Sequence, residues 1–419
     1  MLETAEINRK RQLWILVFAV FFCVFGMKLL FSDSKKGDFP IYYDSIRQSL
    51  EGAPAAPYKT EGYGFVYMPF AYIAMHPMGL FSLKTSRMLH YLVESALLFL
   101  TCIMLLRLTL SEGKYLPYLM GAALMLTFRY LHNNIGYGQM NLVVLFSLVA
   151  ALFFFHRDNK LFSALFMAVA ISFKVTPMLF ILYFILKKEF RLVLYIIILT
   201  LALNFMLPLM LWGMGTGAEV CRAWYGAQFS LGQHNATKLS NYSILSMLYR
   251  FFTDYSWSDL PGRNPVNILS ICKSAVIGMY ITCAVIILAV FVKKYNKPAT
   301  QLMGEYPRNN TFLAMLPEYS MVVIMMLLFS PVSWQHHFVL LLLPHFYLGW
   351  FLLNTGIKNN KAVFYLLLAS FIISGLTTPV IIGERLNRVI MNYSAITFGT
   401  MLLFAAVLLA SSKKHHIRD

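Results

Sequence analysis

One aspartate near the start of the chain stands where a carboxylate could do chemistry. Asp38 lies in the segment Gly37-Asp38-Phe39-Pro40-Ile41-Tyr42-Tyr43, which follows the first hydrophobic run. A carboxylate among aromatic side chains suits a general base, which takes a proton from a hydroxyl group. An aspartate followed closely by proline is also a common helix start, here for a helix over residues 39–50. Both interpretations stay open, and both can hold together.

The neighbours of this aspartate limit the chemistry further. Tyr42 and Tyr43 are expected to contact the substrate. The next carboxylate, Asp44, would point away from Asp38 on one helix, so the pattern does not favour a paired-carboxylate metal site. We therefore expect no metal and no other cofactor.

A second polar group follows much later, in Ser333-Trp334-Gln335-His336-His337-Phe338. Adjacent histidines on a helix point about 100° apart, so His336 and His337 cannot easily chelate one ion together. One of them could act in catalysis while the other is structural, with Trp334 beside the substrate. The alternative is a set of interfacial aromatic and histidine side chains at the end of a membrane span.

Several cations fall on the side of the membrane that we predict to be outside. Lys174, in Phe173-Lys174-Val175-Thr176-Pro177, is costly at membrane depth unless it snorkels or meets an anion. Arg129, Arg222, Lys238 and Arg250 also lie where the positive-inside rule does not require them. An anionic ligand on that side is the simplest reason for them.

Amide side chains occur in Gly138-Gln139-Met140-Asn141. Gln139 and Asn141 offer donors and acceptors suited to hydroxyl groups. The alternative is a turn with a helix cap, which for Gln139 we favour over function. Glu94 is either a functional intramembrane carboxylate or the partner of Arg87.

The elements that must position these groups are membrane helices. The chain of 419 residues has 59% hydrophobic and 13% charged residues, against about 25% charged residues in soluble domains. Apolar runs of about 18 residues or more recur along it. The first, over residues 13–31, is too long for a signal-peptide core and lacks a small-residue cleavage site, so we interpret it as a retained span. The chain is predicted to be an all-α polytopic membrane protein with no sizeable soluble domain.

Charged connections alternate along the chain when Arg9-Lys10-Arg11 is placed in the cytoplasm. We predict about twelve transmembrane helices in one domain over residues 1–419, some of them tilted or broken because they are short. Their approximate ranges are 13–31, 86–107, 115–130, 141–155, 161–173, 175–186, 192–212, 267–292, 312–329, 338–355, 362–376 and 393–410.

Two long outer connections carry most of the candidate site. Residues 32–85 contain Asp38 and an apolar run, 67–80, that suits a short re-entrant or interfacial helix. Residues 213–266 mix aromatic residues with cations and are a candidate donor- or acceptor-binding loop. The net charge of +17 reflects cytoplasmic loops that face anionic lipid, so we expect membrane lipids and no nucleic acid as partners. The five cysteines form no disulfide or metal pattern. Glycosylation sequons begin at Asn235, Asn241 and Asn392.

Taken together, these motifs resemble glycosyltransferase family 87, within the C-type superfamily of membrane glycosyltransferases. That family includes polyprenol-phosphate-mannose-dependent mannosyltransferases. The matching pieces, in the family's order, are Asp38-Phe39 with Tyr42-Tyr43, Tyr67-Met68-Pro69, Gly138-Gln139-Met140-Asn141, Lys174-Val175-Thr176-Pro177 and Trp334-Gln335-His336-His337. The family usually has Tyr-Pro-Pro where this chain has Tyr67-Met68-Pro69.

The resemblance implies C-type architecture, an outward-facing site in a bacterial inner membrane, a polyprenyl-phosphate sugar donor and a glycolipid or glycan acceptor. It implies Asp38 as the base, and a single base opposite the leaving group implies inversion at the anomeric carbon. Lys174, with Arg129 or Arg222, would stabilise the phosphate that leaves. His336 or His337 would orient the acceptor, relay the proton or contact the phosphate. A flippase for lipid-linked sugars and a ligase or phosphotransferase that uses lipid-linked glycans remain as alternatives.

Overall fold

The computed structural model describes residue 26 and residues 37–59, 65–109, 116–235, 238, 240–254, 266–305 and 311–413. Within this described part the regular structure is helical throughout, which agrees with the all-α prediction. Except for Gly26, the predicted first span over residues 13–31 lies outside it. The contacts group the chain into two compact units. The first contains Met1–Ala122, Leu131–Val175 and Arg191–Gln228, and the second contains Ala123–Tyr130, Thr176–Phe190 and Phe229–Asp419. The prediction of one domain over residues 1–419 stays a prediction.

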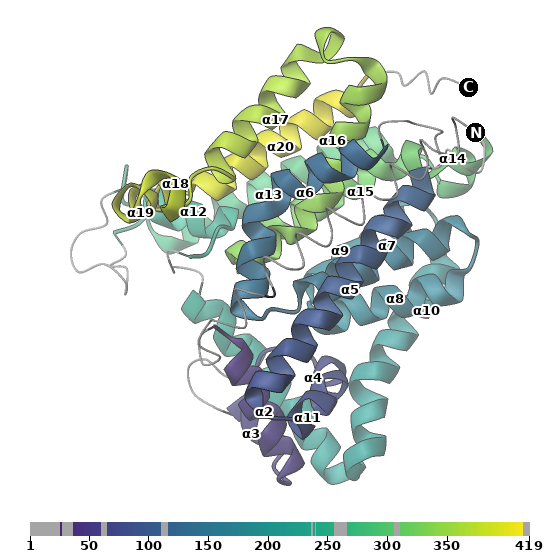
Figure 1. The fold of residues 1–419 in the computed structure, drawn as a ribbon, viewed down its shortest axis with the longest axis vertical. Coiled ribbons are helices and arrows are strands. Elements are labelled where there is room, and N and C mark those ends of the chain that lie inside the picture. Colours follow the sequence, from purple (N-terminus) through teal and green to yellow (C-terminus); the bar gives the residue numbers. More distant parts are fainter. Residues whose placement is uncertain are drawn as a thin grey trace. The chain divides into compact units, whose positions relative to one another are not determined.

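The first unit combines long apolar helices with short ones. In Figure 1, α5 lies beside α7, and α7 packs closely on α8. Helices α6 and α11 each have a part in both units. The helices of this unit are α2 (Phe39–Leu50), α3 (Ala56–Lys59), α4 (Pro69–Met75), η1 (His76–Leu80), α5 (Leu83–Thr109), α6 (Leu116–Tyr137), α7 (Asn141–His156), α8 (Lys160–Phe173), α10 (Phe190–Leu201), η3 (Ala202–Met206) and α11 (Leu207–Asn235).

A π-helical turn fixes the short helix α4 against α8. The turn is η3, and π-helical turns often occur at functional positions. Within it, Asn204 accepts from the backbone N–H of Phe70 at 3.2 Å and donates to the hydroxyl of Ser172 at 2.7 Å. The backbone N–H of Met68 donates to the carbonyl of Ser172 at 3.3 Å. These bonds hold the Tyr67-Met68-Pro69 segment at the C-terminal end of α8.

The second unit is built around α15, nearly all of which is buried. In Figure 1, α17 and α20 run side by side. The helices are η2 (Thr176–Met178), α9 (Leu179–Leu186), α12 (Ile244–Phe252), α13 (Lys273–Tyr295), α14 (Ala299–Glu305), α15 (Thr311–Leu328), η4 (Gln335–Leu341), α16 (Leu342–Thr355), η5 (Lys358–Asn360), α17 (Lys361–Ser374), α18 (Pro379–Ile382), α19 (Glu384–Asn392) and α20 (Ala395–Ser411).

A buried ion pair joins α15 to the end of α9. The ammonium of Lys187 lies 2.6 Å from the carboxylate of Glu318, and both side chains are almost fully buried. The hydroxyl of Tyr183 donates to the same carboxylate at 2.9 Å. We predicted Lys187 as a charge of a cytoplasmic connection, whereas the structure gives it a partner inside the unit. A buried charge is tolerated when it is paired and hydrogen-bonded in this way.

Five helical stretches of the described part are long and apolar enough to cross a membrane. They are Leu83–Thr109, Phe190–Gln228, Lys273–Tyr295, Thr311–Leu328 and Gln335–Thr355. A sixth arises if α19 and α20, which meet at a bend of 61°, form one span. Three further apolar helices, Asn141–His156, Lys160–Phe173 and Thr176–Leu186, are shorter. The chain is therefore an integral membrane protein by composition and helix length, and the count of about twelve spans stays a prediction.

Candidate functional site

The segment that carries Asp38 lies directly against the turn that ends α6. The backbone N–H of Asp38 donates to the carbonyl of Tyr137 at 3.0 Å. A Cβ atom on Gly37 would lie 2.8 Å from that carbonyl oxygen, and one on Gly138 would lie 2.6 Å from the Cβ of Phe39. Both glycines have positive φ, +89° and +67°, which favours glycine. The close backbone approach therefore depends on glycine at two positions.

Asp38 occupies the N-cap position of α2, but its carboxylate does not cap the helix. The predicted helix over residues 39–50 is confirmed as α2, with Pro40 in its first turn and without a side-chain cap bond from Asp38. Instead, the side-chain amide of Gln139 donates to Oδ2 of Asp38. The helix start thus sets the position of the carboxylate, while the Gln139 turn sets its direction.

Two tyrosines fix the orientation of the Gln139 amide. The hydroxyl of Tyr67 donates to Oε1 of Gln139 at 3.2 Å, and the hydroxyls of Tyr42 and Tyr67 lie 3.2 Å apart. Because the amide oxygen accepts from Tyr67, the NH₂ group is the one that faces Asp38. Tyr67 was not among our predicted site residues, although the Tyr67-Met68-Pro69 motif pointed to its segment.

A chain of hydrogen-bonded amide side chains leads from Lys174 to Glu94. The ammonium of Lys174 donates to the side-chain oxygen of Asn141 at 2.7 Å, and the NH₂ group of Asn141 donates to Asn134 at 2.9 Å. The NH₂ group of Asn134 donates to Glu94 at 2.8 Å and to the carbonyl of Gln139 at 3.3 Å. Asn134 therefore connects the residue that binds Asp38 with the residue that binds Lys174.

Glu94 ends this chain at the N-terminus of α7. Its two oxygens accept from the backbone N–H groups of Leu142 and Val143 at 3.3 and 3.2 Å. A carboxylate is favourable at a helix N-terminus. Arg87, the partner that we considered for Glu94, donates to the carbonyl of Gly136 at 3.0 Å. Glu94 and Asn134 thus belong to the site's support, and neither was in our predicted set.

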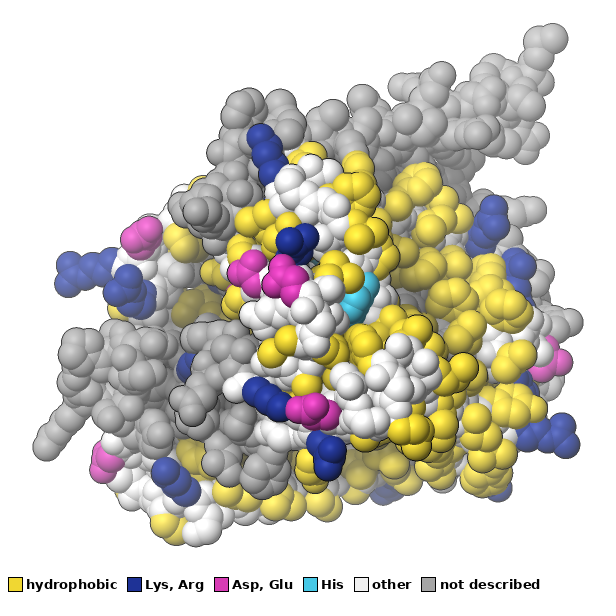
Figure 2. All heavy atoms as spheres, turned by 90° about the horizontal axis from the view of Figure 1, so that it is seen from below, with side chains coloured by type: hydrophobic (Ala, Val, Ile, Leu, Met, Phe, Trp, Pro, Cys, Tyr) yellow, Lys and Arg dark blue, Asp and Glu magenta, His cyan; other side chains and the backbone are white. Residues whose placement is uncertain are grey.

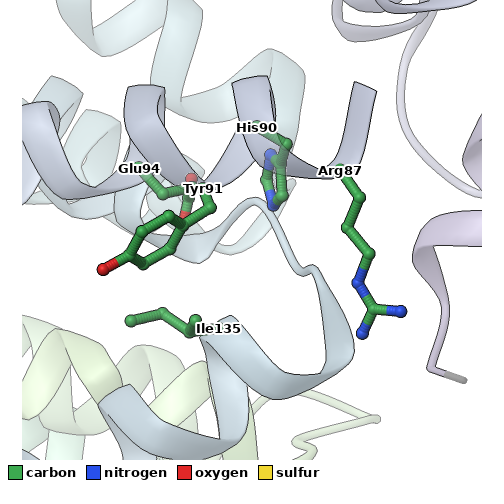
Figure 3. A pocket seen from close by; sticks show the side chains of 5 residues that line it. All are labelled: Arg87, His90, Tyr91, Glu94 and Ile135. Atoms are coloured by element: carbon green, nitrogen blue, oxygen red, sulfur yellow. The ribbon is translucent and has the colours of Figure 1, made fainter. Parts of the chain in front are cut away.

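Figure 3 shows the face of α5 that carries this support. Arg87, His90, Tyr91 and Glu94 line a small enclosed cavity with Ile135, and its volume is about 10 Å³, close to the space that one water molecule needs. The ring of His90 stacks on Phe39, with 5.2 Å between the ring centroids. This face of α5 therefore packs against the residue that follows Asp38 as well as against the end of α6.

The electrostatics suit a carboxylate that exchanges a proton. Burial raises the pKa of the Asp38 carboxyl above its ordinary value, while the hydrogen bond from Gln139 and the charge of Lys174 lower it. Burial is the largest of these effects, so the carboxyl is a stronger base than a solvated aspartate. Its side chain remains partly exposed, which leaves it accessible to a hydroxyl group.

Two predicted residues of the first unit lie outside this group. The hydroxyl of Tyr43 donates to the carbonyl of Phe81 at 2.8 Å, so this side chain braces α2 against η1. Arg222 is exposed on α11, where its charge acts on Glu219, which pairs with Lys59. The face drawn in Figure 2 likewise carries Lys and Arg side chains beside Asp and Glu, with hydrophobic side chains over much of the rest.

Asp44 lies exposed on α2. No group of three or more His, Cys, Asp or Glu side chains in the described residues is placed to hold a metal ion.

The remaining predicted residues belong to the second unit. Arg129 is buried and donates to the carbonyl of Ser374 at 2.6 Å, to the hydroxyl of Thr377 at 3.0 Å and to the sulfur of Met391 at 3.5 Å. These contacts tie α6 to the segment that joins α17 to α19. They engage both terminal nitrogens of Arg129, the side chain that we predicted to stabilise the donor phosphate.

The two histidines lie at the start of η4 and are both buried. Their ring centroids are 4.8 Å apart. The backbone N–H of Trp334 donates to Nδ1 of His337 at 3.3 Å, which gives this histidine a local structural contact. The side chain of Trp334 is partly exposed.

Comparison with known proteins identifies the family. The sequence model of glycosyltransferase family 87 matches residues 65–331, more than half of the chain. This range includes Tyr67, Gln139, Asn141 and Lys174; Asp38 precedes it, and the two histidines follow it. No curated protein and no solved structure matches the chain. The family match confirms the resemblance seen in the motifs, and the chain belongs to glycosyltransferase family 87, a family of membrane glycosyltransferases.

Proposed function

We propose that this glycosyltransferase moves a single sugar, a hexose such as mannose or a pentose, from a polyprenyl-phosphate donor to a lipid-linked or envelope glycan acceptor. The reaction takes place at the outer face of a bacterial cytoplasmic membrane. The observation that carries the proposal is the partly exposed carboxylate of Asp38, oriented by Gln139 and influenced by the charge of Lys174. This combination supplies both groups that the transfer needs, a base and a cation.

Asp38 acts as the base in this mechanism. The acceptor hydroxyl gives its proton to the Asp38 carboxylate while its oxygen forms a bond to the anomeric carbon. The bond between that carbon and the phosphate oxygen breaks, and polyprenyl phosphate leaves with the electron pair. Attack opposite the leaving group inverts the anomeric configuration. A base of this kind contributes about 10²–10⁴-fold to a rate.

Lys174 stabilises the phosphate that leaves. A phosphate released from an ester gains negative charge, so it needs a cation more than it needs a proton. The bond from Lys174 to Asn141 uses one of the ammonium's three N–H donors. A fixed cation at the developing charge lowers the barrier because it needs no reorganisation during the reaction.

Glu94 and Asn134 act as positioning residues. Asn134 binds the backbone of Gln139 on one side and the side chain of Asn141 on the other. Glu94 holds Asn134 and the first backbone N–H groups of α7. Glu94 and Asn134 thereby hold Gln139, which binds the base, and Asn141, which binds the cation, at fixed positions.

The remaining predicted residues, Arg222 of the first unit and those of the second unit, keep their predicted roles as proposals. His336 or His337 orients the acceptor or relays its proton, with Trp334 beside the sugar. Arg129 and Arg222 contribute positive charge toward the phosphate. The contacts of Arg129 within its own unit favour this indirect role over a direct bond to the donor.

The test is transfer in vitro by purified protein from a panel of polyprenyl-phosphate sugars, with wild type, Asp38→Asn and the control Asp44→Asn. Donor-dependent product that is lost in Asp38→Asn and kept in Asp44→Asn supports the enzyme and the base together. Product that survives in Asp38→Asn removes the base from the proposal. A flippase needs no proton acceptor, so it would move lipid-linked sugar equally well in both variants. The anomeric configuration of the product tests inversion, and its mass separates transfer of one sugar from transfer of a glycan or phosphate.

A further inference from the structure

A buried asparagine lies in the π-helical turn η3, distant in sequence from Asp38. The residues around Asn204 are apolar, with Leu201-Ala202-Leu203 before it and Phe205-Met206-Leu207 after it, and its side chain is only 1% exposed. A polar side chain is unfavourable in an apolar membrane segment, and such side chains often have a function. Its place in a π-helical turn points in the same direction. Both features call for a role for this amide.

The side-chain amide of Asn204 makes three hydrogen bonds. Its oxygen accepts from the backbone N–H of Phe70 at 3.2 Å, and its NH₂ group donates to the hydroxyl of Ser172 at 2.7 Å and to the carbonyl of Thr200 at 2.9 Å. Phe70 lies in the first turn of α4, where N–H groups have no partner within the helix, and Met68 at the N-cap position makes no side-chain cap bond. Asn204 therefore caps α4 from another helix.

Asn204 belongs to a helical hairpin. The stretch Phe190–Gln228 contains α10, η3 and part of α11, and it bends at Gly213, where φ is +75°. A Cβ atom on Gly217 would lie 2.7 Å from a carbonyl oxygen of the part before the bend. The thiol of Cys221 donates to the carbonyl of Asn204 at 3.6 Å. The two arms of this α10–α11 hairpin, before and after Gly213, therefore lie side by side.

The second arm of the hairpin holds the same segment as the first arm does. The side-chain NH₂ group of Gln228, in the second arm, donates to the carbonyl of Val66, the residue before Tyr67. Asn204, in the first arm, binds the N–H of Phe70, three residues after Tyr67. The hairpin thus binds the backbone on both sides of Tyr67 through two amide side chains.

Tyr67 connects the hairpin to the base of the proposed mechanism. Its hydroxyl donates to Gln139, whose amide donates to the carboxylate of Asp38. The hairpin also reaches the segment of the proposed cation, because Ser172 precedes Lys174 by two residues. A shift of the hairpin would therefore disturb the direction of the base, and a misplacement of 1 Å can slow an enzyme by about 100-fold.

We propose that Asn204 and Gln228 are positioning residues of the transferase site. They hold the backbone on both sides of Tyr67, so that its hydroxyl stays directed at Gln139 and the Gln139 amide stays directed at Asp38. Both act through Tyr67 and not on the substrate. The inference rests on the proposed function for the role of Asp38 as the base; the contacts of the hairpin do not depend on it.

The test combines transfer kinetics of the purified full chain in detergent with hydrogen exchange. Asn204→Leu and Gln228→Leu each remove one contact of the hairpin. We expect kcat to fall about tenfold in each. The fall in rate at low pH should also move to higher pH, because a weaker bond from Gln139 raises the pKa of Asp38.

Thr200→Val is the control. It removes a buried hydroxyl one turn before Asn204 that has no hydrogen-bond partner within the described residues, and it should keep the wild-type kcat and pH profile. Exchange of the Phe70 amide hydrogen tests the contact without any transfer. We expect faster exchange than wild type in Asn204→Leu and an unchanged rate in Thr200→Val.

A second background separates positioning from a general loss of stability. In Tyr67→Phe, which lacks the hydroxyl that donates to Gln139, Gln228→Leu should cause no further shift of the pH profile. A full further shift there overturns the proposal, as does a wild-type kcat or a wild-type pH profile in either Asn204→Leu or Gln228→Leu. If wild type transfers no sugar from any polyprenyl-phosphate donor, the proposed function fails, and the contact of Asn204 stands or falls by the exchange of Phe70.

Discussion

The side-chain amide of Gln139 donates a hydrogen bond to the carboxylate of Asp38, across 101 positions of sequence. The bond stabilises the ionised carboxylate and lowers its pKa, against the burial that raises it. Gln139 therefore aims the carboxylate and favours its ionised form in a partly buried place. A helix cap would have fixed the carboxylate on its own helix and left it less able to meet a substrate.

Removal of this amide should shift the pH dependence of transfer. The proposed mechanism needs ionised Asp38, so we expect the rate to fall as the pH is lowered through the pKa of that carboxyl. In Gln139→Leu the pKa rises further, and we expect the acid limb of the kcat profile to move to higher pH with a loss of about tenfold near neutral pH. Gln48→Leu, at an exposed position of α2, is the control. An acid limb that stays in place in Gln139→Leu would contradict the assignment.

Local patterns predicted the single residues of the site better than their connections. The start of α2 at Phe39 follows from Asp38 and Pro40, which are neighbours in sequence. The Gln139 segment was correctly expected as a turn, yet its amide also bonds Asp38. Only the fold brings these segments together. The close approach depends on glycine at two positions, because Gly37 packs against Tyr137 and Gly138 packs against Phe39.

The residues that sequence analysis left out are those whose roles arise from distant contacts. Glu94 lies in the middle of an apolar helix, where its sequence neighbours suggested Arg87 as a partner. Its partners are Asn134 and the start of α7, 40 or more positions away. Arg129 was included in the predicted site because a cation on the outer side of the membrane suggested an anionic ligand. In the structure its N–H groups donate to Ser374 and Thr377 instead, which are also distant in sequence.

Loss of the Lys174 charge should slow the chemical step more than it weakens binding. The proposed role is to stabilise charge that develops as the phosphate leaves, so we expect Lys174→Met to lower kcat about 100-fold with a smaller change in the KM of the donor. Lys59→Met is the control, since Lys59 is an exposed lysine of the same unit that pairs with Glu219. A rise in KM with unchanged kcat would show that Lys174 only binds the donor.

Replacement of Glu94 by glutamine should disturb the support of Gln139 and the support of Asn141 at once, because Asn134 connects both to Glu94. The amide of Glu94→Gln has one acceptor oxygen, so it cannot accept from Asn134 and from both N–H groups of α7 together. We expect kcat to fall about tenfold or more and the acid limb to move in the same direction as in Gln139→Leu, because Gln139 loses its support. Thr101→Val is the control: Thr101 is buried on the same helix, and its hydroxyl donates to the carbonyl of Leu97 in that helix. It should leave the pH profile unchanged. A loss of unfolding temperature in Glu94→Gln with a wild-type pH profile would reduce Glu94 to a structural residue.

The two glycines near the end of α6 provide a matched pair for testing the close backbone approach. At Gly138 an alanine must adopt φ of +67°, and its Cβ would lie 2.6 Å from the Cβ of Phe39. At Gly136, two residues earlier and still in α6, an added Cβ meets nothing within 4 Å. Alanine is favoured over glycine in a helix by about 1 kcal/mol, so Gly136→Ala should keep activity and hold or raise the unfolding temperature.

Gly138→Ala should be destabilised by roughly 1–2 kcal/mol from the backbone conformation alone. Its transfer activity should fall further than this cost implies, because relief of the clash moves Phe39, and with it Asp38, away from Gln139. Measurement of unfolding temperature and kcat for both variants separates the two effects. If Gly138→Ala keeps wild-type kcat, the close approach is a feature of stability and the direction of the Asp38 carboxylate does not depend on it.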